Sequence, residues 1–158
     1  MDSKTLEGLL DIFAVLREAE LSVKAFYDAC AAKWPEGAEF WSGIAEQEAR
    51  HAQDMERMAA MLRARPDDFQ PGQLLNPVAI RTFIKGMAWN LDRVSRGELD
   101  QVKALHVARD VESALIEHRI AEMVRTSDQA FLSLARQVAE DTLRHRRDMD
   151  ARLAALKK

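Results

Sequence analysis

The sequence predicts an all-α domain with four long helices packed as a bundle, and three observations support this. The 158 residues include only 4 Pro and 6 Gly, and residues of high helix propensity are abundant. Apolar residues recur at helical spacing over long segments. One block of sequence also occurs twice. A chain of this length can bury one apolar core, so we expect residues 1–158 to form a single domain.

The first two predicted helices are long and closely linked. Leucines and aromatic residues follow a helical period from about residue 4 to residue 33. Trp34-Pro35-Glu36-Gly37 then interrupts the pattern, because proline disfavours helix in the residue before it. The second segment covers 38–63 and ends at Arg65-Pro66. These two helices are expected to form a hairpin.

Three further helices are predicted in the rest of the chain. Asn76-Pro77 is typical of a helix start, since Asn can cap the first turn and Pro is tolerated there. Gly97 marks a break, and Ser127 or Asp128 can cap the last helix. The expected segments are 77–95, 98–125 and 129–156. Two helical hairpins are then joined by a long crossover that contains the extra shorter helix, which is a ferritin-like arrangement.

Composition and charge narrow the function classes. The net charge of −3 and the pI near 5.8 argue against a general nucleic-acid binder. No apolar stretch reaches the length that spans a bilayer, and the first ten residues do not resemble a signal peptide. Cys30 is the only cysteine, so we expect a small buried apolar group rather than a nucleophile. We expect a cytoplasmic protein.

The repeated block covers residues 44–55 and 138–149. The first copy reads I-A-E-Q-E-A-R-H-A-Q-D-M and the second reads V-A-E-D-T-L-R-H-R-R-D-M, with six identical positions. His51 and His145 align, although histidine is rare in this chain. We infer that the second hairpin is a structural copy of the first.

The repeat carries residues that suit a metal. Glu48 and His51 are three positions apart, so their side chains leave one face of a helix. Glu20 and Glu112 lie in the apolar stretches of the preceding helices, where a carboxylate is costly unless it is paired or bound to a cation. Di-iron and di-manganese bundles use one Glu from each of two helices and Glu-x-x-His from the other two. The second half here has His145 without the matching Glu.

Nearly the whole chain resembles the rubrerythrin branch of the ferritin-like superfamily. The motifs that carry the resemblance are Glu20-x6-Tyr27, the segment Ala45–Ala52, Glu112 and the segment Ala139–His145, in that order. A single Glu-x-x-His is weak evidence, whereas the ordered and doubled set is specific.

The resemblance implies a site for two irons that reduces peroxide or oxidises ferrous iron. It implies Glu20 and Glu112 as terminal ligands, His51 and His145 as ligands of one metal each, and Glu48 as a bridge. Manganese or zinc are the alternatives to iron. Relatives with a built-in electron donor carry paired Cys-x-x-Cys motifs that this sequence lacks, so an external redox partner is expected. We also expect a homodimer.

The sequence departs from the family pattern at Thr142, where the second bridging Glu is expected. Three carboxylates are then left for two divalent ions, so we expect the second metal to bind more weakly or to be absent, unless hydroxide makes up the charge balance. Asp141 points about 100° away on a regular helix and could turn inward only with a local distortion. Glu140 points further away. Both are kept as candidate substitutes.

A second departure is Arg109, at a position where rubrerythrins often have a further Glu. Either Arg109 is a solvated partner of Asp110 or Glu112, or its guanidinium replaces a lost cation at the centre. His106 and His118 lie outside the motif and are predicted not to be ligands.

Three functions follow from these patterns. The first is a metal-dependent oxidoreductase that acts on peroxide, oxygen or Fe²⁺. The second is a non-catalytic protein that stores or delivers iron. The third is a metal-free interaction module with a degenerate site.

Overall fold

The computed structural model describes residues 1–114 and 120–156 and confirms the all-α class. Its α-helices are α1 (Ser3–Lys33), α2 (Ala38–Ala64), α3 (Pro77–Ser95), α4 (Gln101–Ala114), α5 (Ile120–Met123) and α6 (Gln129–Ala155). Two short 3-10 turns, η1 (Pro35–Gly37) and η2 (Pro66–Asp68), follow α1 and α2. Both turns begin at the prolines that were predicted to end the helices.

The helix starts are fixed by side-chain caps. Asp2 accepts a hydrogen bond from the backbone N–H of Thr5, and Asn76 accepts one from Val78, each at 2.9 Å. Asp128 accepts from two backbone N–H groups at 3.0 Å, so it caps α6 in preference to Ser127. These bonds satisfy backbone donors that have no partner within the helix.

The predicted helix over 98–125 is wrong at both ends. The α4 helix begins at Gln101, because the Asp100 side chain accepts from the Lys103 backbone N–H at 2.8 Å and caps it. The α4 helix is described as far as Ala114, and the predicted residues 115–119 lie outside the described part. After α5 the chain forms a strand instead of a helix.

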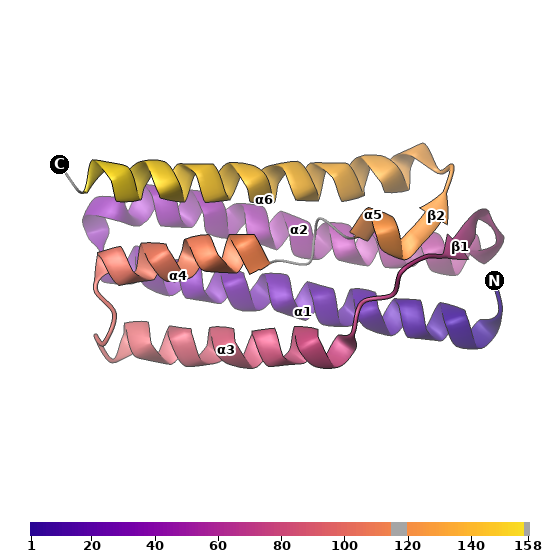
Figure 1. The fold of residues 1–158 in the computed structure, drawn as a ribbon, viewed down its shortest axis with the longest axis horizontal. Helices are drawn as coiled ribbons and strands as arrows, with labels where there is room; N and C mark the ends of the chain where they lie inside the picture. Colours follow the sequence, from indigo (N-terminus) through magenta and orange to yellow (C-terminus); the bar gives the residue numbers. More distant parts are fainter. Residues whose placement is uncertain (115–119, 157–158) are drawn as a thin grey trace.

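This strand, β2 (Val124–Thr126), pairs antiparallel with β1 (Phe69–Pro71), which lies between the predicted helices 38–63 and 77–95. Phe69 pairs with Thr126 and Pro71 with Val124. Phe69 and Val124 are buried, and the Thr126 hydroxyl donates to the Asp68 carbonyl at 2.9 Å. The pairing closes one end of the molecule, near the N-terminus (Figure 1).

Four helices, α1, α2, α4 and α6, lie side by side, and α3 packs on the outer side of α1 (Figure 1). The α1 and α2 helices form the expected hairpin, while α4 packs mainly against α6. In chain order, α3 follows the α1–α2 pair and precedes the α4–α6 pair. It carries the chain back along the length of the molecule (Figure 1). Among the described helices, none has the length and apolar character needed to cross a membrane.

The apolar core is divided into two clusters along the helices. One contains Leu16 and Val138, and the other contains Val23 and Met149. The residues between these positions on α1 and α6 include buried polar side chains. A polar layer is therefore sealed on both sides by apolar packing, and this layer is the candidate site.

Candidate metal centre

The structure brings together all five residues that were predicted as ligands. Glu20 comes from α1, Glu48 and His51 from α2, Glu112 from α4 and His145 from α6. None is more than 2% exposed. Sequence segments far apart in the chain thus place three carboxylates and two imidazoles in one buried layer.

The five residues form two overlapping triads. The first half-site is Glu20, Glu48 and His51, and the second half-site is Glu48, Glu112 and His145. Within each triad, one ligand atom per residue lies within 4.8 Å of the others. Glu48 belongs to both triads, so one carboxylate is shared between the two half-sites.

Glu48 uses a different oxygen toward each half-site. Its Oε2 lies 3.2 Å from Nδ1 of His51, and its Oε1 lies 3.0 Å from Nδ1 of His145. The two imidazole rings stack with centroids 5.9 Å apart. Both histidines therefore present Nδ1 to the shared carboxylate.

The charges in the layer shift two pKa values in opposite directions. Burial alone would raise the pKa of Glu48, but the close imidazoles of His145 and His51 outweigh it and lower this pKa to about 2. Burial would lower the pKa of His145, but Glu112 and Glu48 raise it to about 10. A proton on His145 thus offsets part of the carboxylate charge in this arrangement.

Tyr27 is a further member of the site. Its hydroxyl donates to Oε1 of Glu112 at 2.5 Å, and the side chain is fully buried. The same Glu112 oxygen lies 3.6 Å from Nδ1 of His145. Tyr27 was predicted only as part of the first-helix motif and without a role of its own, although its position seven residues after Glu20 places both on one helix face.

Thr142 is buried in the layer at the position expected for the second bridge. Its hydroxyl donates to the Val138 carbonyl one turn earlier on α6 at 3.0 Å. The side chain is thus engaged with its own helix, and it offers no carboxylate to either half-site.

Asp141 does not take the place of the missing bridge. Its Oδ2 lies 3.4 Å from Nε2 of His51, which is the ring nitrogen that faces away from Glu48, and its Oδ1 lies 2.5 Å from the guanidinium of Arg144. Asp141 therefore contacts a candidate ligand from outside the triads. Glu140 is exposed and lies outside both triads.

Arg109 is not a substitute cation at the centre, so that alternative is wrong. Its guanidinium lies 2.7 Å from a carboxylate oxygen of the neighbouring Asp110, on an exposed surface. His106 belongs to neither of the two triads that the described residues form. His118 lies outside the described residues.

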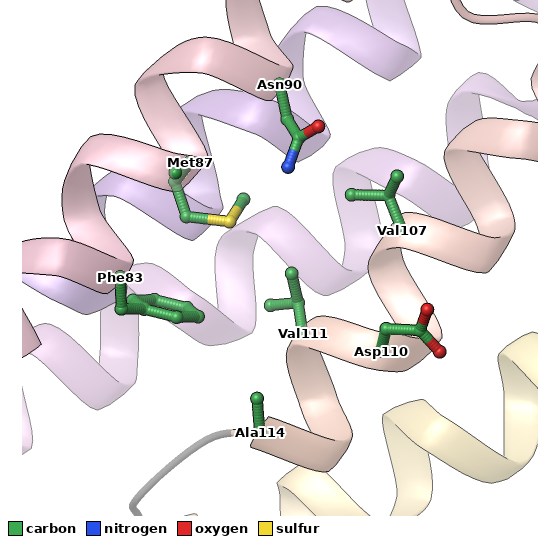
Figure 2. Close-up of a pocket in the computed structure, with 8 residues that line it drawn as sticks. Phe83, Met87, Asn90, Val107, Asp110, Val111 and Ala114 are labelled. Atoms are coloured by element: carbon green, nitrogen blue, oxygen red, sulfur yellow. The ribbon is translucent and has the colours of Figure 1, made fainter. Parts of the chain in front are cut away.

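A separate apolar groove runs between α3 and α4 (Figure 2). Phe83 and Met87 line it from α3, and Val107 and Val111 from α4 (Figure 2). None of the five candidate ligands lines this groove. It is therefore distinct from the polar layer.

Carboxylate oxygens and imidazole nitrogens are suitable ligands for iron, manganese and zinc. The layer offers such atoms to two neighbouring ions, with one shared carboxylate. No protein-family model, curated protein or solved structure matches the chain. The functional assignment therefore rests on the geometry of the site and on the sequence motifs.

Proposed function

We propose that this chain is a ferritin-like protein that binds two metal ions, iron in the first instance, in the polar layer of a four-helix bundle. The observation that carries the proposal is the sharing of Glu48 between two buried triads. The helical arrangement supports it, since two packed pairs of helices are connected through α3 in the manner of bundles with one long crossover.

The residues present fit a pair of divalent ions. In the described part of the chain, Oε1 of Glu48 and Nδ1 of His145 are buried and lie 3.0 Å apart without a hydrogen bond of normal geometry. Buried polar atoms of this kind are costly, and metal coordination would satisfy them. Glu20 and Glu112 would be terminal ligands, His51 and His145 would bind one ion each, and Glu48 would bridge.

Two bound ferrous ions would each supply one electron and become ferric, and the two electrons with two protons would reduce hydrogen peroxide to two waters. In a ferroxidase the same oxidation would occur with Fe²⁺ as the substrate. The protein contribution is to hold the ligands and exclude bulk solvent, through the apolar clusters on both sides of the layer. Thr142 leaves one bridging position to a small ligand in place of a carboxylate. A separate redox partner would return the electrons in a peroxidase cycle.

One observation favours the metal-free alternative. His51 and His145 both contact Glu48, so two imidazoles already face its charge without a metal. In that case the layer is a buried network that fixes the packing of the bundle. Metal binding distinguishes the two proposals, because a divalent ion must displace the proton from His145 in order to bind there.

Anaerobic reconstitution with Fe²⁺, and separately with Mn²⁺ and Zn²⁺, tests the proposal. After gel filtration, elemental analysis is expected to find more than one ion per chain with at least one of the three metals. Glu48→Gln keeps the shape of the side chain but removes the shared charge, so it should lose most bound metal. Glu46→Gln is the matched control, since Glu46 lies on the exposed face of the same helix.

Oxidation of the loaded Fe²⁺ by hydrogen peroxide, followed by absorbance, tests the catalytic part. Oxidation is expected to be faster with the unaltered protein than when the same total amount of Fe²⁺ is added to Glu48→Gln. Absence of bound metal under all three conditions would instead support the metal-free network.

A further inference from the structure

The residues around the candidate ligands differ between the two half-sites. This difference predicts the order in which two metal ions bind. The repeat places Gln47 in the first copy where Asp141 stands in the second. Gln47 immediately precedes Glu48, and Asp141 immediately precedes Thr142. From this position, only the second copy can therefore offer a carboxylate to the outer ring nitrogen of the opposite histidine.

His51 is the histidine that receives it. Its Nδ1 faces Glu48 at 3.2 Å, and its Nε2 faces Asp141 at 3.4 Å. An Nε2–H that donates to a carboxylate leaves the lone pair on Nδ1 for a metal and makes the imidazole a stronger donor. The first half-site is thus oriented for binding before an ion arrives.

In the second half-site, no outer carboxylate among the described residues orients the histidine, and a hydroxyl donates to one of the candidate ligands. Nε2 of His145 makes no hydrogen bond within the described residues. Gln47 is instead engaged with the Gly43 carbonyl at 3.3 Å and with the guanidinium of Arg144. The Tyr27 hydroxyl donates to Glu112 and draws charge from an oxygen that a metal would use.

We propose that the two metal positions are unequal and that the half-site of Glu20, Glu48 and His51 fills first because Asp141 holds His51 from outside. This inference rests on the proposed function, since it requires that metal binds in the layer. Asp141 is a positioning residue that acts through His51 and contacts no metal.

Asp141 can be altered without removing core packing. Its side chain is 15% exposed and lines a hollow between α2 and α6, together with polar residues such as Gln53 and Gln137. Asp141→Asn keeps the shape and removes the charge. Asp148→Asn makes the same change at an exposed position of the same helix and is the matched control.

Anaerobic titration with Co²⁺ alone, followed by calorimetry and by the visible spectrum, tests the order. We expect two binding steps in the unaltered protein. Asp141→Asn should weaken the tighter step by about 10- to 100-fold, the usual effect of losing such an outer carboxylate. Asp148→Asn should change neither step by more than about twofold, since Asp148 is exposed and belongs to neither triad of the described residues.

Two further variants show which half-site gives the tighter binding step. His145→Ala should keep the tighter step and lose the weaker one. Gln47→Asp should tighten the weaker step, because it supplies the equivalent carboxylate to His145, and this gain does not depend on a variant that destabilises the fold.

Two equal steps that Asp141→Asn leaves unchanged would overturn the inference and leave the two-metal proposal intact. Loss of the tighter step in His145→Ala would likewise overturn the order. Absence of any Co²⁺ binding by the unaltered protein would overturn this inference together with the proposed function.

Discussion

Oε1 of Glu48 lies 3.0 Å from Nδ1 of His145, although the two residues belong to different copies of the repeated block. This contact joins the two hairpins at the centre of the bundle. Glu48 also contacts His51 on its own helix. A single carboxylate thus connects both halves of the candidate site, and its environment determines several measurable properties.

The missing second bridge can be restored. Thr142→Glu should tighten binding of the second Co²⁺ by at least about 10-fold, because a fourth carboxylate would neutralise the four charges of two divalent ions. Isothermal titration under anaerobic conditions measures the change.

Thr142→Gln is the control for side-chain size, and it should give no comparable gain. Equal affinities for the Glu and Gln variants would show that position 142 does not face a metal pair.

Removal of the Tyr27 hydroxyl separates stability from metal binding. Tyr27→Phe should lower the free energy of unfolding of the metal-free protein by about 1.5–3 kcal/mol, the typical worth of a hydrogen bond to a charged group. The same variant should bind the second Co²⁺ more tightly, because Glu112 keeps its full charge for the metal. Urea unfolding and metal titration are the two measurements. If Tyr27→Phe lowered both the free energy of unfolding and the affinity for the second Co²⁺, Glu112 would not be a ligand whose charge the hydroxyl reduces.

The five candidate ligands and most helix bounds follow from local sequence features. Prolines, caps and apolar periods act over a few residues, so they are visible in the sequence. The repeat then identified Glu20, Glu48, His51, Glu112 and His145, which the structure places in one layer.

What the sequence analysis missed depends on contacts between distant residues. Strands β1 and β2 are only three residues long, and Asp68 and Thr126, which are bonded across them, are 58 positions apart. No short period marks such strands. The contact of Asp141 with His51 joins residues 90 positions apart and likewise needs the packing of α2 on α6.

The paired strands should make a measurable contribution to stability. An ideal Cβ on Gly72 would lie 2.0 Å from the Glu122 carbonyl oxygen, and the Gly72 backbone N–H donates to the Met123 carbonyl at 2.7 Å. Gly72→Ala should therefore lower the free energy of unfolding by about 1–3 kcal/mol, as overpacking usually does.

Gly8→Ala provides the comparison, since a Cβ there meets no atom within 4 Å and alanine favours helix. Urea unfolding should show this variant as stable as the unaltered protein or slightly more stable. If Gly72→Ala also had no effect, the close approach of these backbone segments would be refuted.

Cys30 is fully buried, as predicted, and burial raises the pKa of its thiol to about 12 from an ordinary value of 9.0. At pH 8 the folded protein should react with a disulfide reagent only after unfolding, because the thiolate is the reactive form. Labelling in buffer and in guanidinium checks this. Equal labelling rates would contradict it, and Cys30→Ala gives the background.

The same shift gives a pH dependence of stability. The thiol of the unfolded chain ionises near pH 9, while the buried thiol of Cys30 stays neutral. The stability that comes from burying the neutral thiol is therefore fully present below pH 9. It is lost as the pH rises from 9 toward 12. Urea unfolding of the unaltered protein should show a steeper alkaline loss of stability than Cys30→Ala, and parallel profiles would argue against burial of this thiol.

Whether Glu48 bridges two metals is tested most directly by anomalous X-ray diffraction. Crystals of protein loaded anaerobically with Fe²⁺, measured at the iron absorption edge, should show two peaks in the polar layer, about 3.5–4 Å apart as in two-metal sites. One peak should lie among Glu20, Glu48 and His51, and the other among Glu48, Glu112 and His145. An iron-free layer, with peaks only at the protein surface, would contradict this bridging role.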